Sequence, residues 1–273
     1  MCVPGCREKV IRGLSRRRLV GGAAAVVSAG AVLASGTAAR ARGSRSFSRV
    51  IDLTHVMPAD FPTFDGPPGI VLERISTLAD DGYNMFHWHI VEHTGTHLDA
   101  PSHFSAGGAS ADAIPIEDLV LPVVVIDIAA RAAEDPETQL TPEDVRAWIA
   151  RHGALPDGCC VAMHSGWDAH VTSDRFRNAG SDGVMRFPGF HPETAALLME
   201  EASVLGIAVD TLSLDTGSST DFGTHIAWLG SGRWGLECVA NLAALPPVGA
   251  TLVVGAPKIE GVTGGISRVM ALV

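Results

Sequence analysis

The chain of 273 residues is acidic and has enough apolar residues to form one sizeable core. It carries 20 Lys and Arg residues against 30 Asp and Glu residues, and 47% of its residues are hydrophobic. The resulting net charge of −10 argues against nucleic acid and against an anionic membrane surface as partners.

Residues 1–41 are predicted to be a twin-arginine export signal. The segment SRRRLV at 15–20 is followed by a weakly apolar run to about Ala34, and Ala39-Arg40-Ala41 offers a cleavage site. This run is shorter than the roughly 18 to 20 strongly apolar residues of a membrane span. We therefore expect a periplasmic or extracellular protein with no stable membrane anchor after cleavage.

Residues 42–273 are predicted to form a single domain, because no linker-like or low-complexity segment divides them. This part keeps 13 basic and 29 acidic residues, a net charge of −16. Its cysteines, Cys159, Cys160 and Cys238, have neither a disulfide pattern nor zinc-knuckle spacing, so we expect buried free thiols.

Short β-like segments dominate the predicted secondary structure. The expected strands are 50–53, 85–91, 123–128, 161–163, 207–214, 251–254 and 269–273. The expected helices are 141–152, with Thr141 as N-cap and Pro142 in the first turn, and 191–206, with Gly206 as its stop. The fold class is therefore α/β or α+β with strands in the majority.

Gly230, Gly232 and Gly235 match the spacing of a dinucleotide-binding fingerprint. That motif needs a strand before it and a helix after it, and the sequence favours neither here. We interpret these residues as turn glycines.

The segment HTGTHLDAPSH, residues 93–103, concentrates residue types that bind metals. It holds His93, His97, Asp99 and His103 within eleven positions. Imidazole together with carboxylate is typical of zinc, manganese or iron sites, whereas a set of oxygen ligands would favour calcium or magnesium. The segment is therefore a candidate transition-metal site.

The spacing in this segment requires a bend. In an extended strand His93 and His97 would lie about 13 Å apart, and a helix would bring them to about 6 Å, but Thr94-Gly95-Thr96 is a poor helix former. We expect Gly95 to take an unusual backbone conformation that folds His93 toward His97. Asp99, two residues after His97, then points to the same side.

His103 is expected to stand beside the metal rather than on it. Pro101 keeps Ala100 extended, and His103 lies six residues beyond His97. The ordinary pKa of histidine is near neutral pH, so this side chain is suited to proton transfer.

The spacing of residues 93–103 resembles the signature of the metal-dependent cyclase-like hydrolases, a family with kynurenine formamidases, isatin hydrolases and trans-dienelactone hydrolase-like enzymes. The similarity covers essentially all of residues 42–273 and includes segments 51–54, 165–167, 210–215, 256–259 and 267–268. It implies a compact α/β fold with a β-barrel-like core of mixed strands and flanking helices. It also implies a homodimer in which a loop of the partner helps to close each pocket.

The same resemblance implies a ligand set. In two-metal members the first ion is held by the residues that correspond to His93, His97 and Asp99. A later histidine and a glutamate twelve residues beyond it complete the site, and these correspond to His225 and Glu237. One or two divalent ions per subunit, zinc or manganese, are expected.

The implied function is metal-dependent hydrolysis of a small amide or lactone carbonyl, nearest to a kynurenine formamidase (arylformamidase). His103 would take a proton from water and return it to the leaving group. The alternatives are hydrolysis of a cyclic amide or lactone, such as isatin or dienelactone, a metal-dependent cyclase or dehydratase of secondary metabolism, and a non-catalytic metal-binding protein.

Other polar and aromatic residues give weaker predictions. The candidates for an apolar pocket wall that binds a small-molecule substrate are Phe61, Phe64, Trp88 and Trp167. His87 and His89 are expected to be solvated strand histidines. Asp210 and Asp215 are expected to be turn and hydrogen-bonding residues rather than ligands.

Overall fold

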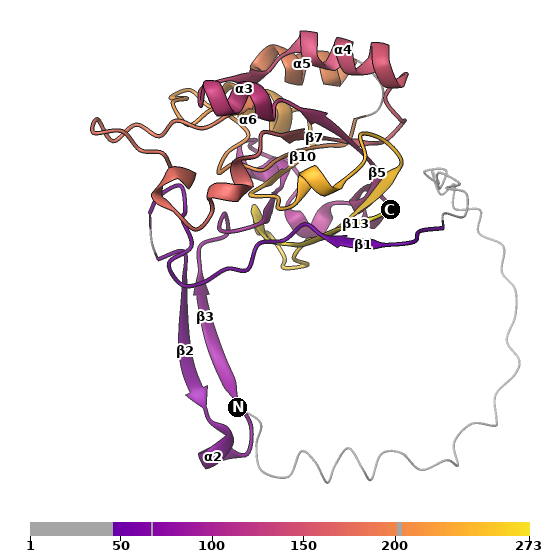
Figure 1. The fold of residues 1–273 in the computed structure, drawn as a ribbon. Helices are drawn as coiled ribbons and strands as arrows, with labels where there is room; N and C mark the ends of the chain where they lie inside the picture. Colours follow the sequence, from indigo (N-terminus) through magenta and orange to yellow (C-terminus); the bar gives the residue numbers. More distant parts are fainter. Residues whose placement is uncertain (1–45, 67, 201–203) are drawn as a thin grey trace, which may run out of the picture. The chain divides into compact units, whose positions relative to one another are not determined.

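A mixed sheet of nine strands organises the fold (Figure 1). The computed structural model describes residues 46–66, 68–200 and 204–273. The strand order is β1-β13-β11-β5-β7-β9-β10-β4-β12, and the sheet curls into a half-barrel. The predicted α/β fold with a barrel-like core of mixed strands is thereby confirmed. The export signal predicted for residues 1–41 lies outside the described residues.

The elements have the following bounds. The strands of the sheet are β1 (Val50–Asp52), β4 (His97–Asp99), β5 (Val120–Asp127), β7 (Cys160–His164), β9 (Gly206–Val209), β10 (Trp234–Glu237), β11 (Ala250–Gly255), β12 (Gly264–Ile266) and β13 (Arg268–Leu272). Two further pairs are β2 (Ile70–Ser76) with β3 (Met85–Ile90) and β6 (Gln139–Leu140) with β8 (Gly189–Phe190). The helices are α2 (Leu78–Asp81), α3 (Ala129–Glu134), α4 (Pro142–His152), α5 (Pro192–Glu200) and α6 (Gly223–Gly230). Short 3-10 turns are η1 (Pro101–His103), η2 (Ala111–Ala113), η3 (Ile116–Leu119), η4 (Trp167–His170), η5 (Asp174–Phe176) and η6 (Leu242–Ala244).

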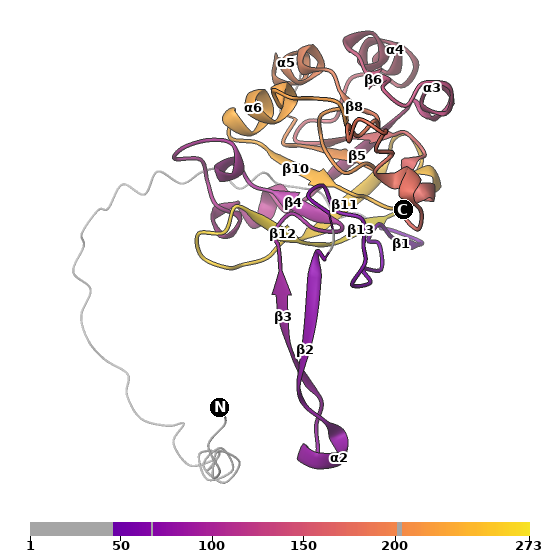
Figure 2. The same cartoon turned by 90° about the vertical axis from the view of Figure 1, so that its left-hand side faces the viewer.

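The central strands are buried on both faces. Strands β5, β7, β9 and β10 run parallel, and helices α3 to α6 lie over one face of the sheet (Figure 2). Val124 and Ile126 of β5 pack with the helix-side cluster around Trp148, whereas Val123 and Val125 pack in the cluster inside the curl. Burial on both sides explains why this strand reads as a continuous apolar run. Among the described residues no helix is both long enough and apolar enough to cross a membrane.

Most predicted strands and one predicted helix agree with the structure. Helix α4 begins at Pro142 behind Thr141, whose N–H donates to the Asp144 carboxylate at 2.8 Å, as in a capping box. The three cysteines are buried free thiols, as predicted. Of the three predicted turn glycines only Gly232 lies in a turn; Gly230 ends α6 and Gly235 lies in β10. The order helix, turn, strand is the reverse of that in a dinucleotide fingerprint.

The prediction for residues 191–214 was wrong in its boundaries. Helix α5 is described only to Glu200, and Gly206 starts strand β9 instead of ending a helix. A Cβ atom on Gly206 would lie 2.3 Å from Cη2 of Trp234, so glycine serves close packing here rather than helix termination. The strand predicted for 207–214 ends at Val209.

Helix α6 was not predicted, because its cap comes from outside the helix. The segment GTHIAWLG has two glycines and two β-branched residues, which disfavour a helix. The carboxylate of Asp215 accepts the N–H groups of Thr224 at 2.7 Å and of His225 at 3.1 Å. An anionic acceptor at the first turn stabilises the helix. Because Asp215 is eight residues before Gly223, the sequence around the helix start does not indicate this cap.

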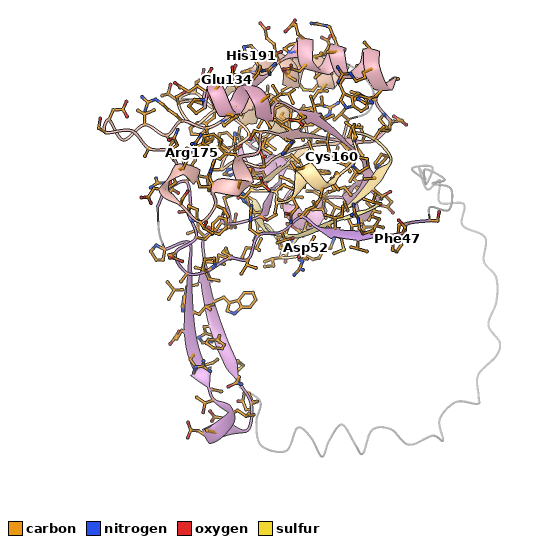
Figure 3. All side chains as sticks on the ribbon, viewed as in Figure 1. Phe47, Asp52, Glu134, Cys160, Arg175 and His191 are labelled. Carbon is orange, nitrogen blue, oxygen red and sulfur yellow. The ribbon has the colours of Figure 1, made fainter. Side chains whose placement is uncertain are left out.

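Strands β2 and β3 form a hairpin arm, residues 70–90, that extends away from the sheet with α2 at its tip (Figures 1 and 2). All six residues of β3 are exposed, and the side chains along the two strands stand clear of the rest of the molecule (Figure 3). The arm therefore has no hydrophobic core of its own.

We predict that Gly206→Ala lowers the melting temperature, because the added Cβ overlaps the Trp234 ring at 2.3 Å, and overpacking of this kind costs about 1–3 kcal/mol. Gly230→Ala is the control, because a Cβ there meets no atom within 4 Å. Thermal unfolding followed by circular dichroism measures both variants. Equal melting temperatures for Gly206→Ala and wild type would contradict the packing account.

Candidate metal centre

The bend at Gly95 brings the first histidine back to strand β4. Gly95 has φ +66°, the left-handed conformation expected for it, and the rings of His93 and His97 lie 5.3 Å apart between centroids. Nδ1 of His97 donates to the Gly95 carbonyl at 2.8 Å, which turns Nε2 toward the site. His93, His97 and Asp99 thus meet on one side of the chain.

Pairing of β4 with β10 and the position of α6 add the two distant residues. Glu237 lies directly opposite His97 in the antiparallel register. The Nε2 atom of His97 lies 3.3 Å from Oε2 of Glu237, and Nε2 of His225 lies 3.1 Å from Oε1. The structure therefore brings together all five side chains predicted as ligands.

Both carboxylates lie between imidazoles. Oδ1 of Asp99 is 2.6 Å from Nδ1 of His93 and 3.2 Å from Nε2 of His97, whereas Oδ2 is 3.4 Å from Nε2 of His225. Glu237 contacts His97 and His225 in the same way through its two oxygens. Two carboxylates shared between sets of histidines suit one ion or a pair of ions.

The residues fit a divalent transition metal. Nε2 of His97 and Oδ2 of Asp99 are buried and have no hydrogen-bond partner, although both point into the cluster. Burial lowers the pKa of His97, but Asp99 and Glu237 outweigh it and raise that pKa to about 10. Without a metal the two carboxylates thus hold a proton on His97; with neutral imidazoles, as metal binding requires, a divalent cation would take over this charge.

Two hydrogen-bond chains orient the imidazoles. Nδ1 of His225 lies 2.6 Å from Oδ2 of Asp215, so this carboxylate both caps α6 and aims Nε2 at the site. Nε2 of His93 contacts the Thr263 hydroxyl at 3.1 Å, and that hydroxyl donates to Glu92. Such partners set the tautomer and ring orientation of metal-binding histidines. Asp215 was correctly expected to be a hydrogen-bonding residue.

His103 lies next to this cluster on turn η1. Its ring stacks on His93 with centroids 3.7 Å apart and planes 20° apart. Burial lowers the pKa of His103 to about 4, against the opposing effect of Asp99, which is below the near-neutral value expected from the sequence. The imidazole is therefore neutral at pH 7 and has a free lone pair for a proton, although it is a weaker base than an ordinary histidine. His93, Asp99 and His103 also offer atoms within 4.8 Å of one another, so the geometry allows His103 to bind an ion as well.

A cavity of about 270 Å³ opens onto the cluster. Its wall contains a row of neighbouring aromatic rings. The ring centroids are 6.1 Å apart for Phe64 and Phe222, 5.6 Å for Phe222 and Phe104, and 4.7 Å for Phe104 and His225. Val91 and Leu212 add aliphatic surface. The pocket therefore combines a metal-type cluster with space for a small aromatic molecule.

Of the four residues predicted for the pocket wall, the structure places only Phe64 there. Phe61 and Trp167 are buried in a separate cluster around Phe176, and Trp88 is 68% exposed on the hairpin arm. Sequence reasoning missed Phe104 and Phe222, although Phe104 directly follows His103. His87 and His89 are exposed on the arm, as expected.

We predict that Asp215→Asn weakens metal binding about 10- to 100-fold, the usual effect of losing a hydrogen-bond partner of a ligand histidine. The variant should show reduced metal content after dialysis, measured by mass spectrometry of the bound elements. Asp127→Asn is the control, because Asp127 pairs with His164 at 3.3 Å outside the site. Equal metal content in both variants would show that Asp215 does not support the centre.

Comparisons with known proteins identify the family of this chain. The family model described as "Putative cyclase" matches residues 51–216, which include His93, His97, Asp99 and His103. An isatin hydrolase from Roseibium aggregatum is 31% identical over 242 residues, covering 82% of this chain and 91% of that protein. A kynurenine formamidase from Salinibacter ruber is 29% identical over 182 residues, covering 67% of this chain and 76% of that protein.

A solved structure shows the same fold. Isatin hydrolase A from Labrenzia aggregata, bound to benzyl benzoate, matches with a TM-score of 0.77 and 36% identity, covering 82% of this chain and 93% of that chain. The family resemblance noted in residues 93–103 is confirmed by these matches. The chain belongs to the Cyclase family and is a metal-dependent hydrolase.

Proposed function

We propose that this hydrolase acts on an amide carbonyl carried by a small aromatic molecule. The observation that carries the proposal is the aromatic cavity of about 270 Å³ that opens directly onto the His, Asp and Glu cluster. A ring of the substrate would pack against Phe64, Phe104 and Phe222, and its carbonyl would face His93 and His97.

Different residues would bind the metal and transfer the proton during hydrolysis. His93, His97 and Asp99 would hold a zinc or manganese ion, and His225 with Glu237 would hold a second one. Such an ion supplies a Lewis acid that activates water and polarises the carbonyl. Neutral His103 accepts the proton of the attacking water and returns it to the departing nitrogen. The stacked His93 ring restricts where the His103 imidazole can move.

Two substrate types are supported by different observations. An arylformamide, which releases formate, agrees with the similarity to a kynurenine formamidase. A cyclic aryl amide, whose ring opens without loss of a fragment, agrees with the similarity to an isatin hydrolase, which spans more of this chain. A cyclase or dehydratase would not add water, so the mass of the product separates it from a hydrolase.

We also propose a homodimer that forms through the hairpin arm. The β2–β3 register places Leu72 opposite Trp88 and Ile70 opposite Ile90, so these side chains and Phe86 share one face of the arm. Leu72, Phe86, Trp88 and Ile90 of this face are exposed, whereas Ile70 is buried and Arg74 lies over the Phe86 ring. An exposed aromatic and aliphatic patch of this kind is typical of a protein interface. A second copy that covers it would bring Trp88 into a buried environment.

The activity test compares N-formylkynurenine with isatin as substrates of the metal-loaded protein, followed by absorbance and product mass. We expect hydrolysis of at least one, with the mass of one water added. His103→Gln should keep its metal and lose about a hundred- to ten-thousand-fold in kcat, the usual effect of removing an acid/base. His152→Gln, on the surface of α4, is the control. No turnover of either compound by fully loaded protein would contradict the proposal, and loss of metal from His103→Gln would make His103 a ligand.

Trp88→Glu should convert the dimer to a monomer, because a buried unpaired carboxylate in an apolar interface is costly. Size-exclusion chromatography with light scattering measures the molar mass. Val71→Glu is the matched control, because Val71 is exposed on the opposite face of the same arm. A monomeric wild type, or a Trp88→Glu variant that stays dimeric, would rule out this interface.

We propose that the protein is exported by a twin-arginine route, on the basis of the SRRRLV segment and the small-residue site at 39–41. Residues 1–45 fused to a reporter should carry it across the bacterial inner membrane. Replacing Arg16 and Arg17 by lysine should abolish this transport. Equal export of both fusions, or export of neither, would contradict the proposal.

A further inference from the structure

The hairpin arm has a polar face opposite its apolar one. His87 and His89 are two residues apart on β3 and therefore point to the same side of the strand. The register with β2 places Glu73 directly opposite His87 and Val71 opposite His89. Two imidazoles and one carboxylate thus share this face of the arm.

One oxygen of Glu73 contacts both histidines. Oε2 lies 3.4 Å from Nδ1 of His87 and 3.1 Å from Nε2 of His89. The rings stand edge to face with centroids 6.4 Å apart. Hydrogen bonds from His89 and then His87 lower the pKa of the Glu73 carboxyl, so it is ionised at neutral pH, as a metal ligand must be.

We propose that Glu73, His87 and His89 form a second metal site, on the arm and separate from the catalytic centre, for a divalent transition ion such as zinc. Two histidines two positions apart on a strand and a carboxylate on its neighbour would supply three protein ligands once the imidazoles turn toward each other, and water would complete a tetrahedral set. Before that turn their donor atoms are not gathered within 4.8 Å, as those of the catalytic cluster are. The side chains are about 60% exposed (62% for both histidines, 57% for Glu73), so the rings can turn to close around one ion.

An ion at this position would stabilise the arm within a single chain, independently of a second copy on its apolar face. The six residues of β3 are all exposed, and a hairpin of two strands without a core is marginal in water. The exposed pairs between Glu73 and the histidines contribute little by themselves. A metal ion would join β2 to β3 directly, close to the point where β3 leads into Val91 and His93 at the pocket.

The site does not depend on the proposed substrate. It also leaves the apolar face of Leu72 and Trp88 available for a second copy, because the two faces point in opposite directions. The arm would then use one face for association and the other for a metal ion.

Zinc binding to the purified holoenzyme tests this site. Protein whose catalytic centre is already loaded is dialysed against a series of zinc concentrations, and bound zinc is measured by elemental mass spectrometry. We expect one additional, saturable equivalent per chain in wild type and in the control His152→Asn. The double variant His87→Asn with His89→Asn should lack it. In Glu73→Gln the affinity for this zinc ion should fall by about tenfold or more, since losing a mere supporting contact of a metal ligand already costs about tenfold.

Hydrogen exchange gives a second readout that activity does not influence. Zinc should slow exchange of the amides in residues 70–76 and 85–90 of wild type and leave the double variant unchanged. Equal exchange of the two proteins without zinc would show that the arm itself is intact in the variant. No additional zinc in wild type, or undiminished additional zinc in the double variant, would overturn the proposal.

Discussion

Two buried carboxylates, Asp99 and Glu237, face the same imidazoles, and the rest of the structure maintains this arrangement. Oxygens of Asp99 and Glu237 lie within 3.4 Å of Nε2 of both His97 and His225. Two carboxylates in a low-dielectric interior need positive charge beside them, either from protonated imidazoles or from a metal ion. The pKa of His97 is raised because Asp99 and Glu237 favour the protonated, positively charged imidazole.

The fold meets this constraint with elements that are far apart in sequence. Strand β4 supplies His97 and Asp99, and its neighbour β10 places Glu237 opposite His97. Helix α6 supplies His225. The Asp215 carboxylate accepts an N–H group at the start of this helix and also orients the His225 imidazole, so the same residue stabilises the helix and positions the side chain. The structural and chemical roles of Asp215 cannot be separated.

The local geometry of the site could be predicted from the sequence, whereas its long-range part could not. The choice of Gly95 as the bend and the extended conformation of Ala100 before Pro101 follow from single-residue stereochemistry, and both agree with the structure. The positions of His225 and Glu237 depend on the β4–β10 pairing and on a helix capped by a distant carboxylate, so only the family resemblance indicated them. Gly206 was misread because close packing against Trp234, not backbone freedom, requires glycine there. Trp88 was assigned to the pocket because sequence alone does not distinguish an arm from a core strand.

The hairpin arm and the metal centre are joined through a short piece of chain, from β3 through Val91 to His93. The proposed function rests on this centre, and Asp99 contacts more of its imidazoles than any other candidate ligand contributed by β4. The most direct test is the metal content of purified wild type and of Asp99→Ala, determined by elemental mass spectrometry. We expect one or two zinc or manganese ions per chain in wild type and almost none in Asp99→Ala. Full metal content in the folded variant would contradict the account of this centre.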